Sequence, residues 1–183
     1  MKVLGLVGLP ASGKGECSAV AEELGIPVIV MGDLIRRYAE EAGLPATDQH
    51  LGTIARRLRE EWGMAALAEL TVPVVREQTA PVVLIDGIRG DAEVELFRRA
   101  FPDFTLVAID CPFDIRLSRL RSRGRSDDMV NEDELLSRDE RECGFGLVHA
   151  MDSADIRIDN TGSREECRAK IEKILKTLVG GMV

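Results

Sequence analysis

Lys14 lies in a glycine-rich segment whose spacing is typical of a phosphate-binding loop. The apolar run 3–7 leads directly into Gly8, four residues follow, and then come Gly13, Lys14 and Gly15. Glycines let successive backbone N–H groups turn toward phosphate oxygens, and the lysine reaches the β- and γ-phosphates. The helix that follows adds the positive end of its dipole. The residues predicted to surround the phosphates are Gly8, Ala11, Ser12, Gly13, Lys14, Gly15 and Glu16.

Acidic residues follow three other apolar runs. Asp33 comes just after the run 27–31, while Asp86 and Asp110 end runs of their own. These runs are short and continuous, which is typical of strands in a parallel sheet that is covered on both faces. Ligands of such sheets bind at the carboxyl ends of the strands. We therefore expect Gly8 and the three aspartates to converge on one crevice.

Strand and helix patterns alternate along the chain, which predicts an α/β fold of three layers, α/β/α, with a five-stranded parallel sheet. Expected strands are 3–7, 27–31, 81–86, 105–110 and 154–159. Expected helices are 16–24, 33–42, 48–61, 64–78, 91–100, 111–123, most of 132–151, and 165–179. The helical block 33–79 is longer than one crossover helix, so we expect it to be an inserted acceptor-binding lobe within a single domain, 1–183.

The charges are unevenly distributed. The net charge of −8 excludes a broad nucleic-acid-binding surface. Arginine nevertheless far outnumbers lysine, and one ten-residue segment holds five arginines. They are Arg116, Arg119, Arg121, Arg123 and Arg125. Because a guanidinium group can bind phosphate through two hydrogen bonds, this segment predicts phosphate binding, with a solvated helix face as the alternative for any one of the five.

Other features point to a cytoplasmic protein. No apolar run is long enough to span a membrane, and the first residues read as a strand and a phosphate loop rather than a signal peptide. The four cysteines are far apart and are expected to be reduced thiols. Cys17 begins a helix at a phosphate site, where a thiol could be acidified, although packing is the favoured role. Trp62 is also expected in the core, with stacking on an acceptor base as the alternative.

Three separated motifs resemble those of the nucleoside monophosphate kinases. The loop Gly8-Leu-Pro-Ala-Ser-Gly-Lys-Gly15 is similar to that family's G-x-P-G-x-G-K-G-T, Met31-Gly-Asp-Leu-Ile-Arg36 to its G-D-x-x-R, and Ile85-Asp-Gly-Ile-Arg89 to its D-G-F-P-R. The segment 123–128 is similar to the short lid of the UMP/CMP kinases. Within this superfamily the phrases Pro-Ala-Ser-Gly-Lys-Gly-Glu and Arg-Asp-Glu-Arg-Glu resemble an archaeal adenylate-kinase-related family, some of whose members carry a dephospho-CoA kinase label.

The resemblance implies an ATP- and Mg²⁺-dependent phosphotransferase that acts on a small phosphate-bearing acceptor, with no nucleic-acid or membrane partner. Phosphoryl transfer depends on positioning and charge neutralisation. Asp33 and Asp86 would hold Mg²⁺ through its waters, although Asp33 also suits a helix N-cap. Arg36 and Arg89 would bind the acceptor's phosphate. A lid at about 119–131 would close over the transferring group, and its predicted contributors are Arg119, Arg123, Arg125 and, from the next helix, Arg138 or Arg141.

Several interpretations stay open. Asn160 and Gly162 either contact the adenine ring or form an ordinary turn. Glu16 replaces the family's threonine, and its carboxylate must either point away from the phosphates or order metal-bound water. A nucleoside monophosphate is the simplest acceptor, and dephospho-CoA is the alternative, with Asp33 as a possible general base. Further alternatives are an ATP-dependent switch or ATPase that acts through a protein partner, and a non-catalytic nucleotide-binding module.

Overall fold

The computed structural model describes residues 1–123 and 132–180, and these residues form one five-stranded sheet in which neighbouring strands are parallel. The strand order is β2-β3-β1-β4-β5. The strand bounds are β1 Lys2–Val7, β2 Val28–Val30, β3 Val82–Ile88, β4 Phe104–Asp110 and β5 Ile156–Asp159. Because β1 pairs with both β3 and β4, the segment that follows β1 leaves the sheet at the middle of its carboxyl edge.

The sheet is buried on both faces, as its continuous apolar runs predict. Side chains alternate along a strand, so β1 divides its apolar residues between two cores. Val3 and Val7 join the core beneath α2, α4, α5 and α8, whereas Leu4 and Leu6 join the core beneath α1 and α9. The three-layer α/β fold expected from the sequence is therefore confirmed.

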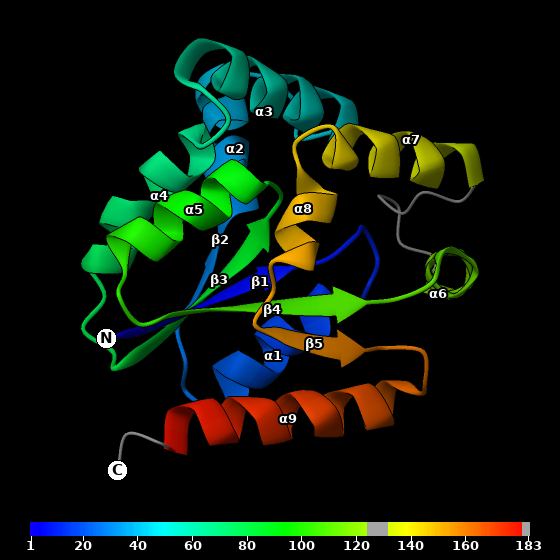
Figure 1. The fold of residues 1–183 in the computed structure, drawn as a ribbon. Helices are drawn as coiled ribbons and strands as arrows, with labels where there is room; N and C mark the ends of the chain where they lie inside the picture. The colour runs from blue at the N-terminus through cyan, green and yellow to red at the C-terminus, as the bar shows by residue number, and fades with distance from the viewer. Residues whose placement is uncertain (124–131, 181–183) are drawn as a thin grey trace.

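Figure 1 shows the helices in two layers around the sheet. α1 and α9 cover one face, and α2, α4, α5 and α8 cover the other. α3 lies outside α2 and α4, and α6 and α7 lie toward the side of the sheet where β4 and β5 end. The helix bounds are α1 Lys14–Glu23, α2 Met31–Glu41, α3 Asp48–Trp62, α4 Ala66–Arg76, α5 Asp91–Ala100, α6 Phe113–Arg123, α7 Glu132–Cys143, α8 Leu147–Asp152 and α9 Arg164–Gly180.

Several element boundaries differ from the expected ones. β2 has only three residues, and α2 begins at Met31 rather than Asp33. The expected helix 132–151 is two helices, because Gly146 adopts a left-handed φ of 91° between α7 and α8. β3 continues past Asp86 through Gly87, whose φ is 95°, and the pairing with β1 shifts by one residue there. An extra residue in one strand of a pair changes the direction of the side chains beside it.

The predicted helical insert consists of α2, α3 and α4 in the structure, and its acceptor-binding role stays a prediction. Trp62, expected in the core, is 49% exposed at the end of α3. Within the described residues, none of the helices has the length and hydropathy of a membrane span. Most of the predicted lid, residues 124–131, lies outside the described residues.

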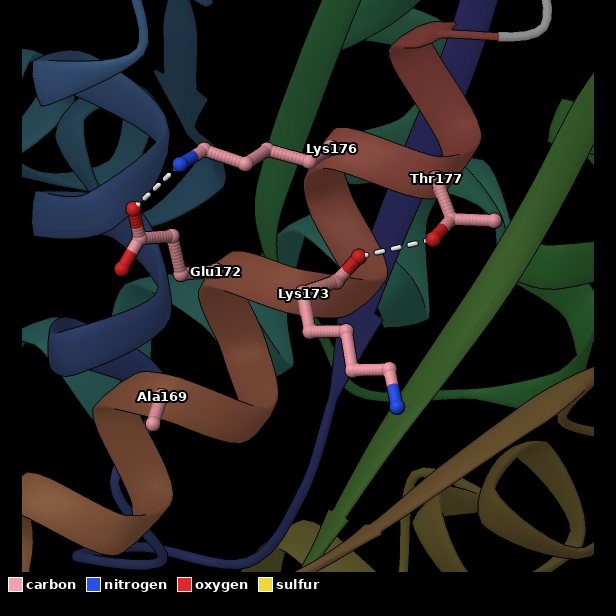
Figure 2. Close-up of a pocket in the computed structure, with 5 residues that line it drawn as sticks. All are labelled: Ala169, Glu172, Lys173, Lys176 and Thr177. Carbon is pink, nitrogen blue, oxygen red and sulfur yellow. Dashed lines mark hydrogen bonds and ion pairs between the residues drawn. The ribbon is translucent and has the colours of Figure 1, made fainter.

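A hollow on the surface of α9 contains none of the residues that the sequence analysis singled out. It is lined by Ala169, Glu172, Lys173, Lys176 and Thr177, all on that helix (Figure 2). Lys176 bridges to Glu172 one turn earlier, at 2.6 Å. The lining therefore consists of one exposed helix face, so we place the candidate site elsewhere.

Candidate active site

The segment 8–13 connects β1 to α1 and is built for close approach. A Cβ atom on Gly8 would lie 2.7 Å from Ser12 Oγ and 2.8 Å from the carbonyl oxygen of Ile109, so only glycine fits there. Ala11 and Gly13 have positive φ values of 60° and 106°. Two left-handed residues so near the start of a helix turn backbone N–H groups into the concave side of the loop. This is the geometry that a phosphate-binding loop requires.

Two side chains from distant elements support this loop. Asn160, just after β5, is buried, and its Nδ2 donates to the carbonyl oxygen of Ser12 at 2.8 Å. Arg116 of α6 is also buried and donates to the carbonyl oxygen of Pro10 at 2.9 Å. Arg116 is held in turn by the carboxylate of Asp139, at 2.6 and 2.9 Å. Asn160 therefore holds the loop from the end of β5, and Arg116 holds it from α6.

Lys14, the first residue of α1, folds back over the loop. Its Nζ donates to the carbonyl oxygens of Gly8 and Leu9, at 2.5 and 3.0 Å. Burial lowers the pKa of Lys14, and the carboxylates of Glu142 and Asp86 oppose that shift. Lys14 therefore lies within electrostatic reach of both α7 and the end of β3.

Glu142 of α7 is the centre of a charged cluster beside Lys14. Its side chain is only 2% exposed, and its Oε1 accepts a hydrogen bond from Arg138 Nε at 3.0 Å. Arg89 Nη1 approaches the same oxygen to 3.4 Å. Burial alone would raise the pKa of Glu142, but the charges of Arg89, Lys14 and Arg138 hold it below its ordinary value of 4.5. Glu142 is therefore a buried carboxylate that stays ionised.

Asp86, at the carboxyl end of β3, faces the start of α1. Its Oδ2 accepts a hydrogen bond from Ser18 Oγ at 2.8 Å. The left-handed Gly87 and the register shift beside it accompany this orientation. Asp86 also contributes to the electrostatic environment of Lys14. The predicted metal-holding aspartate is thus next to the phosphate loop.

Asp33 and Arg36 lie on an exposed face of α2. The two side chains, 59% and 55% exposed, form an ion pair with each other. Val30 pairs with Asp86, so α2 begins beside the carboxyl end of β3. The contacts of the described residues do not connect Asp33 or Arg36 to the Glu142 cluster. Their predicted metal and acceptor roles stay predictions.

Glu16 is turned away from the concave side of the loop. Its carboxylate binds two arginines of α9, with Arg164 Nε at 2.8 Å and Arg168 Nη1 at 2.9 Å. Burial acts to raise the pKa of Glu16, but the hydrogen bonds and charges of the two arginines lower it. The carboxylate therefore ties α1 to α9, which leaves the backbone of Glu16 as its means of contacting a nucleotide.

Arg119 of α6 reaches the turn after β5. Its Nη2 donates to the carbonyl oxygen of Gly162 at 2.8 Å, which brings together two residues predicted to bind the nucleotide. Asn160 begins the same turn, and its side chain supports the phosphate loop. Of the other predicted lid residues, Arg125 lies outside the described residues, as does the side chain of Arg123.

Comparison with known sequences shows the family of this chain. A family model described as an AAA domain matches residues 7–136. A UPF0200 protein from Methanoculleus marisnigri is 55% identical over 180 residues, which is 98% of each chain. Another from Methanoregula boonei is 57% identical over 178 residues, 97% of this chain and 98% of the relative. The chain belongs to the UPF0200 family and contains an AAA domain.

Solved structures with this fold include small-molecule kinases. The crystal structure of TT1252 from Thermus thermophilus has a TM-score of 0.66 at 20% identity, over 100% of this chain and 98% of that one. A gluconokinase from Sinorhizobium meliloti gives 0.56 at 18%, with the same coverage. A shikimate kinase from Aquifex aeolicus gives 0.53 at 22%, over 99% and 98%. The fold of this UPF0200 protein is thus that of a P-loop kinase.

The residues of the site fit a nucleotide and Mg²⁺. Ser12 Oγ is buried without a hydrogen-bond partner among the described residues, and it borders the loop that would hold the phosphates. Asp86 has the oxygen chemistry that Mg²⁺ prefers when it keeps most of its own waters. No group of three or more potential metal-ligating side chains occurs in residues 1–123 and 132–180.

Sequence reasoning missed two residues of this site. Ser18 was not singled out, because its position four residues after Lys14 belongs to no phosphate-loop pattern. Glu142 was overlooked because it is one acidic residue among many in the sequence of α7. The available signal was the helical spacing of four residues from Arg138, which places the two side chains on one face.

Proposed function

We propose that this protein is an ATP- and Mg²⁺-dependent phosphotransferase that acts on a phosphate-bearing small molecule, most simply a nucleoside monophosphate. The observation that carries the proposal is the convergence of Lys14, Arg89 and Arg138 around the buried carboxylate of Glu142, beside a phosphate loop. Nucleotide binding alone has no need of two arginines opposite the loop lysine. Transfer between two phosphates does need them, because charge must be neutralised on both sides of the moving group.

Each residue has a role in this proposal. Bound ATP supplies the phosphoryl group, and Mg²⁺ neutralises its charge. The backbone of the loop holds the donor phosphates, and Lys14 moves from the carbonyl oxygens of Gly8 and Leu9 to the phosphate oxygens. Arg89 binds the acceptor's phosphate and Arg138 contacts the transferring group. Asp86 orients water molecules of the metal.

The ion pair between Asp33 and Arg36 favours a phosphate acceptor over a hydroxyl acceptor. A hydroxyl acceptor such as that of dephospho-CoA calls for a general base, whereas a phosphate monoester is already ionised. Asp33 is exposed and paired with Arg36. The alternative of a switch that acts through a protein partner is also weakened. The carboxylate of Glu16 motivated that alternative, and it pairs with two arginines of α9.

A screen of acceptors tests the proposal. The protein is mixed with Mg²⁺ and a non-hydrolysable ATP analogue, and its thermal midpoint is measured with AMP, CMP, UMP, dTMP or dephospho-CoA. A true acceptor stabilises the closed complex by mass action, by about 3 kcal/mol at a hundredfold excess over its dissociation constant. Each acceptor that stabilises is then assayed for turnover with ATP and with GTP. Turnover with none of the five would contradict the proposal.

A further inference from the structure

Glu142 brings two positively charged side chains to one point. Arg138 Nε and Arg89 Nη1 both approach its Oε1, at 3.0 and 3.4 Å. The carboxylate is 2% exposed, while the side chains of Arg89 and Arg138 are 23% and 28% exposed. The carboxylate therefore lies beneath the two guanidinium groups, and parts of both remain open to solvent.

Two guanidinium groups that approach the same carboxylate oxygen repel each other when no phosphate lies between them. The repulsion is larger at a partly buried site than in water, because the effective dielectric constant is lower. One carboxylate between them offsets that repulsion and fixes both groups through charge-assisted hydrogen bonds. Each guanidinium has five N–H donors, and the contact with Glu142 Oε1 engages only part of that set.

Arg89 is also fixed from its backbone. Its N–H donates to Glu93 Oε2 at 2.7 Å, and Glu93 Oε1 pairs with Arg59 of α3 at 2.6 Å in a fully buried ion pair. The guanidinium of Arg59 lies 4.2 Å from the ring centre of Phe145, in the turn after α7. Helices α3, α5 and α7 thus all restrict the position of Arg89. The remaining freedom is in its side chain, which lies against Glu142.

We propose that Glu142 is a positioning residue that holds Arg89 and Arg138 together as one clamp for the transferring phosphoryl group and the acceptor phosphate. This inference rests on the proposed function. Arg138 comes from the helix that follows the predicted lid, and Arg89 from the end of β3. Glu142 joins the two before any ligand arrives, so less order has to be gained in the transition state.

A general-base role for Glu142 makes a different prediction. A base needs an oxygen free to take a proton, and it produces a limb in the pH–rate profile that disappears when the base is removed. Loss of a positioning carboxylate lowers the rate at every pH at which Glu142 is ionised and leaves the shape of the profile over that range unchanged. A wild-type limb between about pH 5.5 and about pH 8 that disappears in Glu142→Gln would overturn the positioning role.

The direct test compares two ligands. Mg·ADP fills the donor site, and Mg·ADP with aluminium fluoride adds a planar anion that resembles the transferring phosphoryl group. Both affinities are measured by calorimetry for the full chain, Glu142→Gln and the control Glu140→Gln, which removes an exposed charge from the same helix. We expect Glu142→Gln to bind Mg·ADP within about twofold of wild type but the fluoride complex about 10- to 100-fold more weakly. Glu140→Gln should match the wild type for both ligands.

The contrary outcomes are separable. Wild-type affinity of Glu142→Gln for the fluoride complex, or an equal loss for both ligands, would overturn the role of Glu142 and leave the kinase proposal intact. If aluminium fluoride adds no affinity in the wild type even when the acceptors of the screen are present, both proposals fail. Should Glu142→Gln not fold, Glu142→Asp keeps the charge but withdraws it by one methylene group. We expect a selective loss of about three- to tenfold for the fluoride complex, and a folded variant with unchanged affinity would overturn the inference.

Discussion

The carboxylate of Glu16 lies next to a phosphate site without repelling phosphate, because Arg164 and Arg168 of α9 bind it on the other side. The sequence raised the conflict, since a negative charge in the first turn suits the helix dipole but not a neighbouring phosphate. It could not resolve the conflict, because α9 lies about 150 residues later in the chain and nothing local pairs the two segments.

Glu16→Gln should therefore leave nucleotide binding almost unchanged. The substitution removes the charge but keeps the shape of a side chain that faces α9. We expect the affinity for Mg·ATP to change by less than about threefold, and the thermal midpoint to fall slightly, since partly exposed ion pairs contribute little. Calorimetry and thermal unfolding check the two expectations. A loss of ATP affinity of about tenfold or more would mean that the carboxylate acts in the site.

The cysteine next to Glu16 behaves as a packing residue. Burial raises the pKa of the Cys17 thiol to about 12, and the neighbouring Asp86 adds to the shift. The start of the helix does not acidify it, because the apolar core between α1 and α9 surrounds the side chain. The favoured packing role predicted from the sequence is therefore the one that agrees with its position.

Elements with strong local patterns could be predicted, and those that depend on tertiary contacts could not. The bounds of β1, β3 and β4, which bring Gly8, Asp86 and Asp110 to one edge of the sheet, were predicted to within two residues because their apolar runs are continuous. The break at Gly146 was missed because its left-handed turn has helical sequence on both sides. Trp62 was expected in the core on residue type alone, but it ends an amphipathic helix on its exposed side.

The turn after β5 should determine how tightly the phosphate loop binds ATP. Asn160→Ala removes the hydrogen bond to the carbonyl oxygen of Ser12 and leaves that buried oxygen without this donor. The loss of such a bond is worth about 1–3 kcal/mol, so we expect ATP to bind about 10-fold more weakly. Calorimetry with Mg·ATP measures the effect, and Thr161→Ala, an exposed neighbour, is the matched control. Equal affinities for Asn160→Ala and the control would contradict the supporting role.

The buried ion pair between α3 and α5 should be important for stability. Arg59→Met leaves the carboxylate of Glu93 buried without its charged partner, which costs about 3–5 kcal/mol. The urea midpoint measures this cost. Arg57→Met breaks an exposed pair with Glu61 on the same helix and should leave the midpoint nearly unchanged. Similar midpoints for the two variants would show that the Arg59 pair does not anchor α3.

At the scale of the whole molecule, two carboxylates with lowered pKa values make the free energy of unfolding depend on pH. Glu16 and Glu142 both have pKa values below their ordinary value of 4.5 in the folded protein. The unfolded chain therefore binds protons more readily as the pH falls below about 4.5, and stability that is present above this pH is lost below it. Urea midpoints between about pH 6 and about pH 3 should fall for the wild type and fall less steeply for Glu16→Gln. Parallel curves would contradict the shift at Glu16.

The candidate site was partly accessible from the sequence. Lys14, Arg89 and Arg138 were singled out, and the structure gathers them around Glu142. Spacing from a strand end identified Lys14 and Arg89, whereas Arg138 came from the resemblance to the kinases, with Arg141 as its alternative. The spacing from Arg138 pointed to Glu142 only as a helix pair, since its contact with Arg89, just after β3, arises in the tertiary structure.

Transfer of the terminal phosphate from ATP to a phosphate-bearing acceptor tests the central claim most directly. Radiolabelled ATP is incubated with the five acceptors and the products are separated, for the wild type, Lys14→Ala and Arg89→Ala. We predict a labelled product with at least one acceptor, none with Lys14→Ala, and an acceptor KM about 10- to 100-fold higher with Arg89→Ala while ATP affinity is retained. Undiminished transfer by Lys14→Ala, or label released only as inorganic phosphate by the wild type with every acceptor, would contradict the account.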